Sequence, residues 1–448
     1  MKAFKYISKS AEVEVDKCLY FYVYNTFLNI MQPLFDYLES KTDETIKTLD
    51  ELVRFQTHVP PGDNYEKALD YAAARFENLG FEVEKINMSR ELFEKKNPRL
   101  THLLGDRVNL SVIKNVGAKK TLLINTHLDV VPASENWSFP PFECTVKDGR
   151  IFGRGVADSK GGPAALFTVL SAMEELDIKP KYNLNIALTT DEEMGPYSGL
   201  CHLADLGKLK ADHFLSMDGD SDDITIASNG NVDWQIDVFG KSYHSGSSFM
   251  GVNAIEKTIP VMNELMALKE KVEKRRSKVP ASMVISEKTG LKTLMPVLNI
   301  TVMNAGVKQN IIPDRCTMKG DRRFIPEENY IDVRNEFETA IKNVRNNYSD
   351  LKISYSFDEI YAPMLTDMNH PWIKEVQTVA SEVSGRAVTL AGAQGSLDVA
   401  YAVKVTGLPA CCFGIGRRIE SNAHADDENI RIEDIEMYTK FLGKLITD

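Results

Sequence analysis

The chain has 448 residues, of which 43% are apolar, and its formal net charge is −11. A chain of this length can bury a large core and is expected to form two or three domains. The acidic balance argues against a protein whose main task is to grip nucleic acid or an anionic membrane, because both need a basic surface, and it favours small-molecule or peptide chemistry.

Residues 1–40 are expected to form an accessory segment with helical character. Its apolar run from Cys18 to Met31 is interrupted by asparagines, and is too short and too polar to span a bilayer. The 6 cysteines of the chain show no paired spacing, and the adjacent Cys411 and Cys412 lie in a strand-like apolar run. Reduced, buried thiols are typical of this pattern, so a cytoplasmic location is expected.

The main body combines helical periodicity with near-continuous apolar runs. Helices are expected over residues 43–55, 64–79 and 161–176, and strands over 80–87, 108–114, 120–131, 182–190, 213–219 and 408–416. Apolar strands that alternate with helices indicate an α/β fold with a mostly parallel sheet and helices on both faces. Residues 41–228 and 361–448 are therefore expected to form one catalytic domain.

A different pattern begins near residue 229. The stretch "VDWQIDVF" alternates apolar and polar residues, which predicts a strand with one wet face. A helix over 254–274, strands over 297–303 and 316–324, a helix over 327–346 and a strand over 352–357 are expected to follow. This β-α-β-β-α-β order is a split βαβ, or ferredoxin-like, arrangement. An inserted second domain is expected over residues 229–360.

Imidazoles and carboxylates follow the predicted strands of the main domain. They are His127 and Asp129, Glu192 and Glu193, Asp218, and the more distant His424, with Asp158 just before the helix at 161–176. Functional groups gather at the carboxyl ends of strands in open α/β sheets, so these side chains are expected to share one rim. Buried together, the carboxylates would repel one another strongly unless cations lay among them.

Each of these residues also has a simpler interpretation. A single histidine at a strand end is more often structural, Asp158 could cap its helix, and the acidic run at 191–193 could be a solvated turn. As a group, mixed nitrogen and oxygen donors favour zinc or a similar divalent ion. Asp129 lies two residues after His127, and is expected to orient its ring; Glu192 and Glu193 diverge, so that one can bind metal while the other faces water.

Several motifs in order resemble one known family. "THLDVVP", "GRGVADSKGG", "TTDEEMG", "SMDGD", "YHSG" with "GVNAI", and "NAHADDE" are similar to those of metallopeptidase family twenty, which includes acetylornithine deacetylase, succinyl-diaminopimelate desuccinylase, aminoacylase and glutamate carboxypeptidase. The resemblance extends from about residue 42 to the end of the chain. It implies a catalytic domain with an inserted lid and dimerisation domain.

The resemblance also implies two divalent metal ions per subunit, zinc first, with cobalt or manganese as alternatives. Asp158 would bridge the two ions. His127 and Asp218 would be the other ligands of one ion, and Glu193 and His424 the other ligands of the second. Glu192 would be the general base, and Asp129 the partner that orients His127.

Three residues of the inserted domain are implied to act on substrate. His244 would reach the active site of the partner subunit in a homodimer and polarise the scissile carbonyl. Asn310 and Arg323 would bind substrate, Arg323 through a carboxylate. The alternatives are a structural His244, and an Arg323 that only pairs with Asp321.

One stretch departs from the family pattern. In "GAQGSLDVA" a glycine-rich turn with Ser396 and Asp398 is present, but Ala400 stands where the family often has arginine. This departure weakens the assignment to the desuccinylase subgroup. Ser159 stands where several deacylases of the family carry Met and several dipeptidases carry Asp, so it supports neither a deacylase nor a dipeptidase.

The expected activity is hydrolysis of an amide bond in an N-acyl amino acid, as a deacylase of the acetylornithine deacetylase or succinyl-diaminopimelate desuccinylase type in amino-acid metabolism. A dipeptidase or carboxypeptidase of the same family is the alternative, and a catalytically silent binding protein is the third possibility. A small molecule or short peptide is the expected partner, with no nucleic acid and no membrane.

Overall fold

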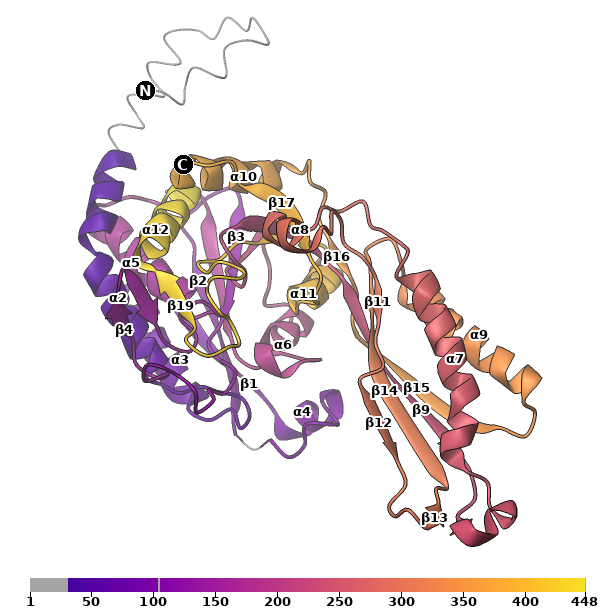
Figure 1. Cartoon of the computed structure of the whole chain (residues 1–448). Helices are drawn as coiled ribbons and strands as arrows, with labels where there is room; N and C mark the ends of the chain where they lie inside the picture. The colour runs from indigo at the N-terminus through magenta and orange to yellow at the C-terminus, as the bar shows by residue number, and fades with distance from the viewer. Residues whose placement is uncertain (1–30, 104, 448) are drawn as a thin grey trace, which may run out of the picture.

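The computed structural model describes residues 31–103 and 105–447, which form a rounded body and a long arm (Figure 1). Residues 1–30 of the predicted accessory segment lie outside the described residues. Residues 31–40 are helical, and Leu34 and Leu38 are buried in the main core. They pack over Gly443, where an added Cβ would lie 3.3 and 3.2 Å from them. The described end of this segment is therefore part of the body.

The body is built on one large sheet. Its strand order is β1 (Glu82–Met88), β2 (Arg107–Lys114), β6 (Asn183–Thr189), β3 (Thr121–His127), β7 (His213–Ser216), β18 (Ala410–Cys412), β8 (Asp223–Ser228) and β16 (Met364–Leu365), with β17 (Thr389–Ala393) also paired to β8. The central strands β6, β3, β7 and β18 run parallel. Their carboxyl ends therefore meet at one rim.

The expectation of a mostly parallel sheet is wrong at the edges, and the sheet is mixed. β2 pairs antiparallel with β1 and β6, and β8 pairs antiparallel with β18 and β16. A continuous apolar run reports burial on both faces of a strand and carries no information on its direction. Burial alone does not fix direction either, because β2 is buried from Arg107 to Val112 and still runs antiparallel.

Helices cover both faces of this sheet. α2 (Thr42–Val53), α3 (Tyr65–Asn78), α5 (Gly161–Glu175), α10 (Pro371–Ser384) and α12 (Ile432–Thr447) share one core with Leu122 and Ile124 of β3. α6 (Gly199–Asp205) and α11 (Val399–Thr406) share another core with the intervening Leu123. Successive side chains of β3 thus enter opposite cores, as strand geometry requires.

The arm is a second sheet with two long helices on one face (Figure 1). Its strands are β9 (Gly230–Phe239), β11 (Val297–Leu298), β12 (Val302–Ala305), β14 (Arg315–Phe324) and β15 (Lys352–Tyr361), in the order β11-β14-β9-β15 with β12 also on β14. Trp234 and Ile236 of β9 face α7 (Ala254–Val272) and α9 (Tyr330–Asn347) in one buried cluster. The role of the arm as a lid and dimerisation domain stays a prediction.

Shorter elements complete the described chain. They are α4 (Arg90–Lys96), β4 (Thr145–Lys147), β5 (Arg150–Phe152), η2 (Glu192–Met194), β10 (Tyr243–His244), η3 (Ser245–Met250), α8 (Met283–Thr289), β13 (Ile311–Ile312) and β19 (Asn429–Arg431). Among residues 31–103 and 105–447, every helix is too short or too polar to span a bilayer. The five cysteines of the same ranges are free thiols; four of them are buried, and Cys144 is partly exposed.

A substitution in the helix at residues 31–40 tests whether this helix is part of the main core. Leu34→Ala is expected to lower the free energy of unfolding by about 2–5 kcal/mol, because it leaves a cavity in a core position that is 0% exposed. Chemical denaturation measures the change, with the exposed Gln32→Ala as control. A loss for Leu34→Ala no larger than that of the control would contradict this packing.

Candidate metal centre

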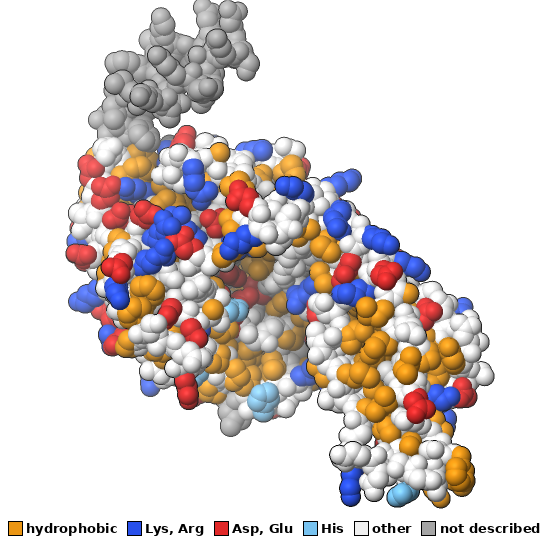
Figure 2. Space-filling model, viewed as in Figure 1, with side chains coloured by type: hydrophobic (Ala, Val, Ile, Leu, Met, Phe, Trp, Pro, Cys, Tyr) orange, Lys and Arg blue, Asp and Glu red, His pale blue; other side chains and the backbone are white. Residues whose placement is uncertain are grey.

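The predicted ligands converge at the carboxyl ends of the parallel strands. His127 ends β3, Glu193 lies in η2 directly after β6, and Asp218 follows β7. Asp158 precedes α5, and His424 comes from the loop between β18 and β19. Figure 2 shows a hollow on this side of the body, with acidic and histidine side chains inside it.

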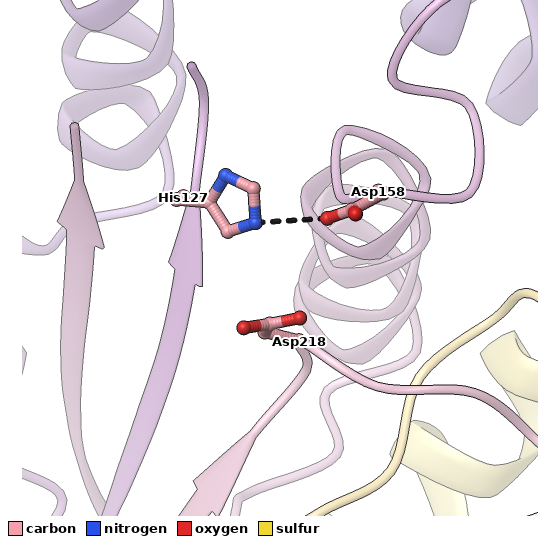
Figure 3. A group of neighbouring side chains, drawn as sticks. All are labelled: His127, Asp158 and Asp218. Atoms are coloured by element: carbon pink, nitrogen blue, oxygen red, sulfur yellow. Dashed lines mark hydrogen bonds and ion pairs between the residues drawn. The ribbon is translucent and has the colours of Figure 1, made fainter. Parts of the chain in front are cut away.

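His127 is fixed from both sides of its ring. The side chain is 1% exposed, and its Nε2 lies 3.1 Å from Asp158 Oδ1. Figure 3 shows the imidazole and the carboxylates of Asp158 and Asp218 around a common space. The other ring nitrogen, Nδ1, lies 3.0 Å from the backbone oxygen of Asp129 and 3.5 Å from its Oδ1. The hydrogen bond is the one to the backbone, because 3.5 Å is too long for a side-chain hydrogen bond of normal strength.

The Asp129 carboxylate has a second contact. Its Oδ2 accepts a hydrogen bond of 3.0 Å from the backbone N–H of Glu193. Asp129 therefore ties the end of β3 to the turn after β6, and holds His127 and Glu193 in a fixed relation.

His424 completes a second group. Its Nε2 lies 3.0 Å from Glu193 Oε2 and 3.1 Å from Asp158 Oδ2. Asp158 thus directs Oδ1 to His127 and Oδ2 to His424. One carboxylate with one oxygen toward each of two donor groups is the arrangement that a bridging ligand needs.

The donor atoms are close enough to share cations. His127, Asp158 and Asp218 form one group, and Asp158, Glu193 and His424 another, with the ligand atoms of each group within 4.8 Å of one another. These are the two sets that the family resemblance implies. Nitrogen and oxygen donors of this kind suit zinc, manganese or cobalt.

The electrostatics of the group also fit bound cations. Burial raises the pKa of Asp218 to about 7. Burial, with the neighbouring charge of Asp158, raises the pKa of Glu193 to about 7. Burial and the charge of Asp218 raise the pKa of Glu192 well above its usual range. Since these three carboxylates resist ionisation beside the other acids, divalent cations would offset the repulsion.

Two predicted substrate residues lie away from this centre. His244, in β10, pairs with Ile311 of β13 at the far end of the arm (Figure 1) and is exposed. Asn310 lies beside it, and its backbone oxygen accepts a hydrogen bond of 3.0 Å from Ser245 N–H. Neither residue is brought to the metal ligands of its own chain.

Arg323 lies on β14 between the arm and the body. Its Nε donates to Asp321 Oδ2 at 3.1 Å, the contact that the structural alternative requires. Its Nη1 also donates to Ser396 Oγ of the body at 3.0 Å. Arg323 therefore links the arm to the turn that leads to Asp398.

Asp398 is a buried carboxylate to which the sequence motifs assign no metal or catalytic role. It accepts a 2.6 Å hydrogen bond from Ser198 Oγ, and one of its oxygens lies within 4.8 Å of donor atoms of Glu192 and Asp218. It follows β17, a strand that the sequence pattern does not predict. The strand-end rule, which locates the predicted ligands, could locate Asp398 only if β17 were predicted as well.

A cavity of about 200 Å³ adjoins the ligands. It is lined by Asp158 and Asp218, and by Asp220, Leu397 and Arg418 among others. Arg418 Nη2 lies 2.7 Å from Asp220 Oδ2 on its wall. A larger groove of about 390 Å³ lies between α7 and α9 on the arm, away from these side chains, and carries no ligand cluster of this kind in the described residues.

Comparison with known proteins gives a family match and related folds. Residues 123–448 match the model of peptidase family M20/M25/M40. A probable succinyl-diaminopimelate desuccinylase of Staphylococcus epidermidis is 28% identical over 380 residues, which cover 81% of this chain and 91% of that protein.

Solved structures of similar fold include two peptidases. The M20 family metallo-carboxypeptidase Sso-CP2 from Sulfolobus solfataricus has a TM-score of 0.71 and 20% identity, over 90% of this chain and 98% of that one. The di-peptidase Dug1p from Saccharomyces cerevisiae has a TM-score of 0.71 and 15% identity, over 93% of this chain and 98% of that one.

The ligand geometry predicts that divalent cations stabilise the fold. With free Zn²⁺ at about 100 times its dissociation constant, one site is expected to add about 2.7 kcal/mol to the free energy of unfolding. Thermal unfolding of chelator-treated protein with and without Zn²⁺ measures the shift. His424→Ala is expected to reduce the shift, while the exposed His102→Ala keeps it. An equal shift in both variants would remove His424 from the ligand set.

Proposed function

Because the chain belongs to peptidase family M20/M25/M40, we propose that it is a two-metal hydrolase that cleaves the amide bond of an N-acyl amino acid. Asp158 carries this proposal, since its two oxygens lie 3.1 Å from His127 and 3.1 Å from His424. In this proposal Asp158 would bind both ions, His127 and Asp218 would hold one of them, and Glu193 and His424 would hold the other. Zinc is the proposed metal, with cobalt or manganese as alternatives.

Glu192 is the proposed general base. One of its oxygens lies within 4.8 Å of donor atoms of both His127 and Glu193, so it reaches the ligand cluster without a place in either of the two ligand groups. Bound divalent cations supply an activated water and polarise the scissile carbonyl. Glu192 accepts the proton from that water and then delivers it to the leaving amine, the two roles of one acid–base residue.

The substrate class is supported by several observations. The similar protein from Staphylococcus epidermidis is named as a probable desuccinylase, and 91% of its length is covered. A cavity of about 200 Å³ suits a small acyl amino acid, and the guanidinium of Arg418 on its wall can donate hydrogen bonds to a substrate carboxylate. A dipeptidase or carboxypeptidase is the alternative, favoured by the peptidase neighbours of similar fold and by Ala400.

The arm is the proposed lid and dimerisation domain. Every residue of β12 is exposed, and this edge strand carries the exposed apolar side chains of Val302 and Met303. Exposed apolar residues on an edge strand favour pairing with a second chain. In the proposed homodimer His244, at the far end of the arm, polarises the carbonyl of a substrate bound to the partner subunit. Asn310, beside His244, binds that same substrate, and Arg323 binds the substrate of its own subunit.

A substrate panel tests the proposed function. Zinc-loaded protein is expected to hydrolyse N-succinyl or N-acetyl amino acids with a higher kcat/KM than free dipeptides, measured by the release of amine. Faster hydrolysis of dipeptides would select the peptidase alternative, and the absence of any hydrolysis would favour a silent binding protein.

Glu192→Ala is the internal control of this test. It is expected to lower kcat by about 10²–10⁴-fold, the usual contribution of a general base, while metal content stays at the wild-type value. The exposed Glu82→Ala of β1 should retain full activity. Turnover of Glu192→Ala near the wild-type rate would disprove the base assignment.

A mixing experiment tests the shared site. His244→Ala and Glu192→Ala are each expected to be inactive alone, because each lacks one part of every site. An equimolar mixture of subunits that exchange freely should recover about a quarter of the wild-type activity, because half of the dimers then contain one complete site. Activity no higher than that of the separate variants would leave His244 with a structural role.

A further inference from the structure

The loop that presents Asp158 is held by a buried carboxylate to which the mechanism above assigns no role. Glu428 is 0% exposed. Its Oε1 accepts hydrogen bonds from the backbone N–H groups of Ala157 at 2.9 Å and Asp158 at 3.0 Å. Its Oε2 accepts from Gly155 N–H at 2.9 Å and from Arg154 Nη1 at 2.8 Å. One side chain thus binds four donors of a single loop.

Arg154, the partner of Glu428, also contacts the loop that carries His424. Arg154 is buried, and its Nη2 donates to the backbone oxygen of Ala425 at 3.0 Å. Glu428 itself lies four residues after His424, whose backbone is left-handed with φ of 65°. The Arg154–Glu428 ion pair therefore joins the segment that carries Asp158 to the segment that carries His424.

The consequence for the ligands is geometric. Asp158 directs one oxygen to each histidine at 3.1 Å, so a shift of its backbone changes both ligand groups together. Glu428 binds the amide of Asp158 itself and that of the preceding residue. Residues that orient metal ligands in this way affect metal affinity as well as stability.

We propose that Glu428 is a positioning residue for Asp158 and His424, and that it acts together with Arg154 to set the spacing of the two ligand groups. This inference rests on the proposed two-metal site. It assigns a function to the last acid of the motif "NAHADDE".

Glu428→Gln tests the inference with little change in size. A glutamine has one acceptor oxygen, and its NH₂ group faces two of the four donors, which lose their acceptor. We expect Zn²⁺ binding to weaken by about 10–100-fold, the range for residues that orient metal ligands, in isothermal titration of chelator-treated protein. We also expect the visible spectrum of the Co²⁺-loaded protein to change, since it reports ligand geometry.

Glu328→Gln is the matched control in the arm. Glu328 accepts from the buried Arg322 at 3.0 Å and from the backbone N–H of Ile325 at 3.2 Å, and it belongs to none of the candidate ligand groups. It should lower the thermal midpoint without a change in Zn²⁺ affinity or in the Co²⁺ spectrum. Wild-type affinity in Glu428→Gln would overturn the positioning role.

Arg154→Lys provides a second variant in case Glu428→Gln does not fold. Lysine keeps the positive charge beside Glu428 but cannot bond both Glu428 and Ala425 in the same geometry. A smaller loss of Zn²⁺ affinity is expected, and an unchanged affinity and Co²⁺ spectrum would count against the inference. If wild-type protein binds none of Zn²⁺, Co²⁺ and Mn²⁺, the two-metal proposal fails. If wild type binds Zn²⁺ and a folded Glu428→Gln variant matches it, only the inference about Glu428 fails.

Discussion

Carboxylates buried against one another cannot all be ionised without a compensating positive charge, and this constraint governs the centre of the molecule. Glu192, Glu193 and Asp218 crowd around His127 and Asp158, and burial raises the pKa of each of these three acids. Unless cations compensate it, such an arrangement opposes folding. The cluster therefore fits the proposed binuclear site, in which Asp158 would be shared between the two ligand groups.

The central sheet and buried ion pairs hold these side chains in place. Parallel strands at the middle of the sheet bring the ends of β3, β6 and β7 to one rim, so ligands distant in sequence become neighbours. Buried ion pairs then fix the connecting loops. Arg154 and Glu428 hold the segment before α5, and Arg107 lies 3.4 Å from Asp191, the residue immediately before Glu192. Loss of one partner of a buried ion pair leaves an uncompensated buried charge, so both pairs oppose movement of these loops.

The sequence predicts much of this arrangement for identifiable reasons. Apolar periodicity locates the helices and central strands, and the strand-end rule finds His127, Glu193 and Asp218. Strand direction at the sheet edges is not predictable from the same pattern, because burial of both faces looks identical in parallel and antiparallel strands. Asp398 and the backbone contact of Asp129 depend on how segments far apart in sequence pack, and spacing does not encode that packing. His244 lies at the far end of the arm, so its predicted role depends on a second chain.

Anomalous diffraction can show whether Asp158 bridges two cations, as proposed. A crystal grown with Zn²⁺ and measured at the zinc absorption edge should give two peaks about 3.5–4 Å apart, the spacing of two-metal hydrolase sites. One peak is expected beside His127 and Asp218, and the other beside Glu193 and His424, with Asp158 between them. A single peak, or peaks that Asp158 does not contact, would contradict it.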